Sequence, residues 1–80
     1  MSVGAQVIAI LAQHAPDSAG EMTSAHSLAD VGIDSVGLVQ VLFEIEETFD
    51  VDVNFDPNTP PVDVADVIAA VDRAIAQNGQ

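Results

Sequence analysis

The chain lacks cysteine and lysine altogether, and Arg73 is its only Lys or Arg residue. The absence of cysteine excludes a disulfide scaffold, a thiolate zinc site and a cysteine nucleophile, and it fits a reducing compartment. No run of about 18 uncharged apolar residues occurs, so we expect no membrane-spanning segment. The first residues lack the basic region of a secretory signal peptide. We therefore expect a cytoplasmic protein.

Acidic residues dominate the charge: thirteen of them give the 80-residue chain a net charge of −12. This charge repels nucleic-acid phosphates and anionic lipid, so neither nucleic acid nor membrane is an expected partner, whereas basic proteins are attracted. Because 49% of the residues are apolar, the chain can still bury a core. We expect one small domain over residues 1–80, working as a monomer.

Apolar residues at helical spacing predict a first helix over about residues 3–14, which ends before Pro16. A second helix is expected over about residues 35–49, with Asp34 and Ser35 as residues that favour a helix N-terminus. Its predicted core-facing stripe comprises Leu38, Leu42, Ile45 and Phe49.

A third helix is expected after Asp63, with Asp66 at the position of a capping-box acid, and Asn78-Gly79 supplies its stop signal. Residues 15–34 form a long first loop, and residues 50–62 are expected to be extended or to contain one short helical turn. We therefore predict an all-α fold, a small antiparallel bundle of three main helices with room for a short helix before the last.

Ser35 is the residue on which a functional interpretation centres. Gly32 permits a positive φ just before the second helix and so allows a tight turn there. A helix N-terminus favours anions, so a phosphate attached to the Ser35 hydroxyl would lie in a compatible field. Asp34 could help to hold a divalent cation or orient the hydroxyl, but Asp34 and Ser35 could equally serve only as an N-cap.

The segment Gly32-Ile33-Asp34-Ser35-Val36, followed by a helix that ends Phe-Glu-Ile-Glu-Glu-Thr-Phe at Phe49, closely resembles the acyl carrier protein family. That family carries an Asp-Ser-Leu signature, a helix ending of the Leu-Glu-Glu-x-Phe type and a strongly acidic surface. The resemblance is good over residues 28–53. The flanking helices resemble the family only in their pattern of apolar residues. The chain departs from the family pattern at three places. Val36 replaces leucine, Gln40 is neutral, and residues 56–61 are proline-rich where the family often has a short helix.

The resemblance implies that Ser35 receives 4′-phosphopantetheine through a phosphodiester bond, and that the thiol of this arm holds an acyl group as a thioester. Asp34 matches the family's aspartate before the serine. The implied partners are a phosphopantetheinyl transferase and acyl-loading and acyl-processing enzymes, and the protein itself would not be an enzyme. Fatty acid, polyketide or related biosynthesis is the implied setting, and an aminoacyl or peptidyl carrier is the alternative.

The second helix also has a flank beside its core stripe. At 100° per residue, this flank carries Val36, Val39 and Phe43 near Ser35 and continues with Glu46 and Asp50, with Glu47 adjacent. The apolar residues could be only the edge of a wide core stripe. In the family, the corresponding flank docks basic partner enzymes, with charge guiding the encounter and the apolar patch fixing the register.

Three other functions have partial support in the sequence. The oxygen-bearing residues at alternate positions from Asp50 to Asn58 resemble the start of an EF-hand loop, but Phe55 and Pro61 stand where glycine and glutamate are needed, so we expect no metal site. Ser35 with His14 or His26 could suggest a hydrolase, but the chain has no Gly-x-Ser-x-Gly motif. An acidic interaction module that needs no modification is the third alternative.

Overall fold

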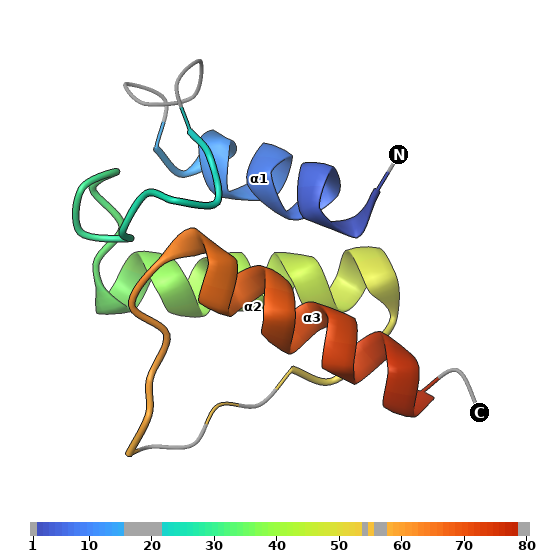
Figure 1. Cartoon of the computed structure of the whole chain (residues 1–80). Helices are drawn as coiled ribbons and strands as arrows, with labels where there is room; N and C mark the ends of the chain where they lie inside the picture. Colours follow the sequence, from blue (N-terminus) through green and yellow to red (C-terminus); the bar gives the residue numbers. More distant parts are fainter. Residues whose placement is uncertain (1, 16–21, 54, 56–57, 79–80) are drawn as a thin grey trace.

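The computed structural model describes residues 2–15, 22–53, 55 and 58–78. Within these ranges the chain forms three helices, α1 (Val3–Gln13), α2 (Ser35–Phe49) and α3 (Val64–Asn78). α1 packs against both α2 and α3 and runs in the opposite direction to them (Figure 1). The predicted all-α antiparallel bundle with a long first loop is therefore confirmed. The described residues between 50 and 62 form no short helix.

Side-chain caps explain where α1 and α2 begin. The hydroxyl of Ser2 accepts a hydrogen bond from the Ala5 N–H at 3.2 Å, and Asp34 Oδ1 accepts one from the Gly37 N–H at 2.8 Å. Each bond satisfies one of the N–H groups that a helix start leaves without an intrahelical partner. The predicted limits of both helices are confirmed to within one residue. Pro16, which we expected to end the first helix, lies outside the described residues, as does Gly79.

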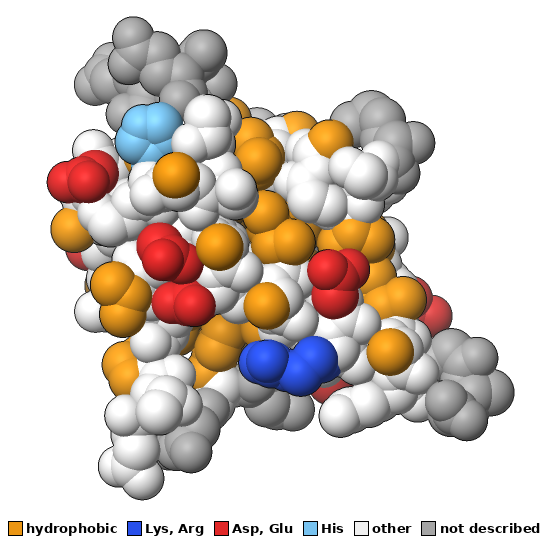
Figure 2. All heavy atoms as spheres, viewed as in Figure 1, with side chains coloured by type: hydrophobic (Ala, Val, Ile, Leu, Met, Phe, Trp, Pro, Cys, Tyr) orange, Lys and Arg blue, Asp and Glu red, His pale blue; other side chains and the backbone are white. Residues whose placement is uncertain are grey.

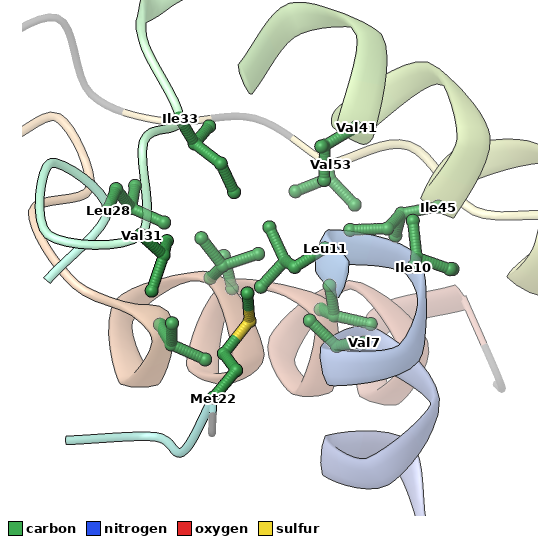
Figure 3. Packing of buried hydrophobic residues seen from close by; sticks show 14 of the residues in the cluster. Val7, Ile10, Leu11, Met22, Leu28, Val31, Ile33, Val41, Ile45 and Val53 are labelled. Carbon is green, nitrogen blue, oxygen red and sulfur yellow. The ribbon is translucent and has the colours of Figure 1, made fainter. Parts of the chain in front are cut away.

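The core is formed by aliphatic side chains from all three helices and from the segments between them (Figure 3). In α2 the buried residues are Val41 and Ile45, while Leu38, Leu42 and Phe49 are only partly buried against the core. The predicted stripe was therefore wrong in missing Val41. Seventeen residues make up this buried cluster: Val7, Ile10, Leu11, Ala15, Met22, Leu28, Val31, Ile33, Val41, Ile45, Val51, Val53, Val64, Val67, Ala70, Val71 and Ala74.

The described part of the long first loop, residues 22–34, is tied to the start of α3. The Leu28 N–H donates to the Val62 carbonyl at 2.9 Å, and the Val64 N–H donates to the His26 carbonyl at 3.0 Å. Leu28, Val31 and Ile33 of this loop are buried in the core. These contacts satisfy part of the backbone of residues 22–34 and hold these residues against the bundle.

α3 begins with a reciprocal cap in which aspartate replaces the usual glutamate. Asp63 Oδ1 accepts from the Asp66 N–H at 2.9 Å, and Asp66 Oδ2 accepts from the Val62 N–H at 2.9 Å. The same Asp66 oxygen lies 3.4 Å from the Asp63 nitrogen, a longer hydrogen bond. The predicted capping box is therefore formed, with the shorter acid reaching back to the residue before the cap.

This cap predicts a pH-dependent contribution to stability. The N–H groups of Val62 and then Asp63 hold the pKa of Asp66 below its usual value of 3.8. Because the folded pKa is lower than the unfolded one, the stabilisation is complete above about pH 4 and is lost as pH falls through the folded value. Asp66→Ala should therefore lower Tm at neutral pH, with a difference from wild type that shrinks in acid.

A thermal-unfolding series from pH 7 to about pH 2 checks this expectation. Asp72→Ala is the matched control, since Asp72 is exposed on the same helix and its side chain makes no hydrogen bond among the described residues. It removes the same charge without removing a cap. A Tm difference for Asp66→Ala that stayed constant down to the lowest pH would contradict the assignment.

Candidate functional site at the start of helix α2

Ser35 is the first residue of α2, and it is exposed. Gly32 adopts a φ of 82°, and the Ile33 N–H donates to the Leu28 carbonyl at 2.9 Å. Only glycine adopts such a φ readily, so the predicted tight turn before the helix is confirmed. Buried Ile33 then fixes the turn to the core, which holds Ser35 at the surface.

The N-cap is Asp34 and not Ser35, which leaves the serine hydroxyl uncommitted. Asp34 Oδ1 is engaged by the Gly37 N–H, whereas within the described residues no side-chain hydrogen bond involves the Ser35 hydroxyl. A Cβ at Gly37 would lie 3.3 Å from Asp34 Oδ1, so a glycine at this position in the first turn leaves room for the capping carboxylate. The hydroxyl is thus presented beside the positive end of the helix dipole.

The flank of α2 that follows Ser35 is exposed and apolar. Val36, Val39 and Phe43 expose 67%, 51% and 64% of their surface, so they are not the edge of the core stripe. Monomeric proteins tolerate single exposed apolar residues, but three on one flank beside an exposed hydroxyl form a continuous surface. We refer to Val36, Val39 and Phe43 as the apolar flank.

An acidic groove continues from this flank at the end of α2. It is open, has a volume of about 560 Å³, and is lined by Phe43, Glu46, Glu47, Asp50, Val51 and Asp52. Asp50 ends the helix in a left-handed conformation, with a φ of 56°, and its N–H donates to the Glu46 carbonyl. This reversal brings Val51 and Asp52 back beside the helix. Sequence reasoning missed these two residues, because the helical projection stops where the helix does.

Glu46 has a structural contact as well as a place in the groove. Its Oε2 accepts a hydrogen bond from the Val53 N–H at 2.9 Å in a partly buried position. Val51 and Val53 are themselves buried, so this bond holds their segment against the core. Residues 51–53, in the segment that we expected to be extended, form neither helix nor strand.

This contact separates the roles of two neighbouring glutamates. Glu46→Ala should lower the free energy of unfolding by about 1–3 kcal/mol, because the Val53 N–H loses its acceptor in a partly buried site. Glu47→Ala, at an exposed neighbour, should change it by no more than about 0.5 kcal/mol. Urea denaturation of both variants measures the difference. Equal effects would show that the carboxylate of Glu46 does not hold the segment.

Neither histidine contacts Ser35. The Nδ1 atom of His26 lies 3.0 Å from the Thr23 nitrogen and 3.1 Å from Thr23 Oγ1. His14, at the end of α1, places Nε2 3.5 Å from Glu44 Oε1 of α2. The polar contacts of both rings are therefore made elsewhere, and no Ser–His pair is formed from the described residues.

The residues that suggested calcium binding are only partly covered by the structure, because Asn54 and residues 56–57 lie outside the described ranges. Over the described residues, no group of three or more His, Asp or Glu side chains is placed to hold a metal ion. Nor does any described helix combine the length and hydropathy needed to cross a bilayer.

Comparison with family models matched residues 5–56 to the family described as phosphopantetheine attachment site. Neither a search of curated proteins nor a search of solved structures found a significant match. The matched range covers well over half of the chain and includes all of α2 with the exposed Ser35. The chain therefore belongs to the phosphopantetheine attachment site family and is a non-catalytic carrier protein with a 4′-phosphopantetheine prosthetic group.

Proposed function

We propose that Ser35 is the residue to which 4′-phosphopantetheine is attached. The observation that carries this proposal is the exposed Ser35 hydroxyl at the first position of α2, with the capping role taken by Asp34. A phosphate esterified there would be adjacent to the free N–H groups of the first helical turn, which favour an anion. The residues present therefore fit the group. Asp34 contributes by fixing the helix start that presents the hydroxyl.

We further propose that the cargo is an acyl group used in fatty acid, polyketide or related biosynthesis. When bound, the arm supplies a thiol that holds the cargo as a thioester. The Gly-Ile-Asp-Ser sequence at residues 32–35 resembles that of fatty acid and polyketide carriers more than the Gly-Gly-x-Ser form of peptidyl carriers. The absence of cysteine and the net charge of −12 are consistent with a cytoplasmic monomer that meets basic partner proteins.

The mass of the intact protein isolated from its own cells tests the chemical identity of the cargo. We expect a species heavier than the polypeptide by one phosphopantetheine group, and a second species that also carries an acyl group. An aminoacyl or peptidyl adduct would overturn the acyl assignment in favour of the alternative type of carrier. Hydroxylamine, which cleaves thioesters, should remove the cargo and leave the arm in place.

We propose that partner enzymes dock on the apolar flank and on the acidic groove beyond it. The apolar flank offers burial next to Ser35, and Glu46, Glu47 and Asp50 offer negative charge further along the same helix. Charge of this kind accelerates encounter with a basic partner, while apolar contact fixes the docked position. The transferase that modifies Ser35 and the enzymes that load and process the acyl group would share this surface.

Phe43→Ala and Glu47→Gln separate the two contributions. Binding of a partner enzyme should weaken with Phe43→Ala at every salt concentration, whereas the loss with Glu47→Gln should shrink as salt screens the charge. Binding measured by calorimetry at low and high salt distinguishes these patterns. If neither variant changes binding, the partner docks on another surface.

A further inference from the structure

Four large apolar side chains are exposed in the described residues, and one of them lies outside α2. Val36, Val39 and Phe43 form the apolar flank, while Val62 lies in the segment before α3 and exposes 66% of its surface. The Val62 side chain is not part of the buried core, and the hydrogen bonds of Val62 are made by its backbone N–H and carbonyl. Its side chain is therefore available for contact with another molecule.

Backbone hydrogen bonds link the segment of Val62 to the turn that precedes Ser35. The Val62 carbonyl accepts from the Leu28 N–H at 2.9 Å, and the Leu28 carbonyl accepts from the Ile33 N–H at 2.9 Å. A single residue, Leu28, thus links Val62 to Ile33, which precedes Ser35 by two positions. Consecutive Cα atoms are about 3.8 Å apart, so this path is short compared with the width of a protein interface.

The starts of α2 and α3 lie at the same end of the molecule, where residues 22–34 connect to both (Figure 1). A stable interface buries about 800 Å² on each partner, which corresponds to some 20–30 residues. An enzyme that reaches the Ser35 hydroxyl must cover the surface around it on more than one side. Exposed apolar residues therefore lie at the starts of both helices: the apolar flank follows Ser35 on α2, and Val62 precedes α3.

We infer that Val62 is a second docking point, contacted by the transferase that esterifies Ser35 and separate from the apolar flank. The inference rests on the proposed attachment at Ser35. The part of the enzyme that meets Val62 is apolar and uncharged, in contrast to the basic part that faces the acidic groove. Figure 2 shows that acidic side chains lie among apolar ones over the face that it presents.

Transfer kinetics with coenzyme A and a phosphopantetheinyl transferase test this inference. Val62→Gln keeps the net charge and the backbone bonds and removes the branched apolar surface. We expect its KM for the carrier to rise about tenfold, the effect of losing roughly half of a buried valine contact, with kcat unchanged. Ala9→Gln, an exposed change on α1, is the matched control and should leave KM within about twofold.

The outcomes separate this inference from the proposed function. If the wild-type chain is not loaded on Ser35, the proposed function fails. If wild type and Val62→Gln are both loaded on Ser35 with the same KM, only the docking point is overturned. Methyl NMR provides a second measurement: the Val62 signals should shift when the transferase is added to the unmodified chain. If they shift only after the arm is attached, the arm covers Val62 and the inference is wrong.

Discussion

Replacing Ser35 with alanine is expected to abolish loading by a phosphopantetheinyl transferase, leaving the unmodified mass even after prolonged incubation with coenzyme A. The alanine methyl group has no oxygen to esterify, so the effect is complete loss and not a change in rate. Ser24→Ala is the matched control, because Ser24 is also exposed and lies in the loop that connects to the start of α3. It should be loaded like wild type. Loading of Ser35→Ala at any other serine would contradict the proposed attachment.

The same variant should leave the fold unchanged. Ser35 is exposed, and the N-cap bond is made by Asp34, so the substitution removes neither core packing nor the cap. Alanine is also the best intrinsic helix former. Far-UV circular dichroism and Tm should therefore match those of wild type. A large fall in Tm would mean that loss of loading could reflect unfolding, and would assign Ser35 a structural role.

Leu11→Ala should have the largest effect on stability, a loss of about 2–5 kcal/mol. Leu11 is fully buried in α1, the helix that packs against both others, so its truncation leaves a cavity at the centre of the bundle. A domain of this size is stabilised by roughly 5–15 kcal/mol at most, so the loss is a large part of the total. Urea denaturation followed by circular dichroism measures it.

Leu42→Ala is the comparison for Leu11→Ala. This substitution removes the same atoms as Leu11→Ala. Because Leu42 is only partly buried against the core, we expect a smaller loss of unfolding free energy. Equal losses for the two variants would contradict the placement of Leu11 at the centre of the core. Because Ser35 depends on the bundle for its position, Leu11→Ala should also reduce loading under conditions in which it is partly unfolded.

The helices could be predicted from the sequence because their signals are local. Asp34 and Asp63 are capping residues directly before apolar residues at helical spacing, and both cap as expected. The burial of Val41 could not be predicted as readily. Val41 and Leu42 both lie on the inner side of α2, and which of them is fully buried depends on where α1 crosses, which no local pattern records.

The position of Ser35 could be predicted, but much of its surroundings could not. A serine at a helix start after Gly32 is a local feature, and the positive φ of Gly32 follows from residue type. The link between Val62 and the turn before Ser35 arises from backbone bonds through Leu28, which lies more than thirty residues from Val62 in the sequence. Backbone pairing of this kind leaves no side-chain pattern, so only the structure reveals it.

The most direct test of the account is to locate the arm on the wild-type chain by fragmentation mass spectrometry after loading with coenzyme A. We expect one phosphopantetheine group per chain, on the peptide that contains Ser35 and on that residue within it. Finding phosphopantetheine on Ser24 or Ser27 would contradict attachment at Ser35. So would a chain that stays unmodified while a reference carrier protein is loaded efficiently in the same assay.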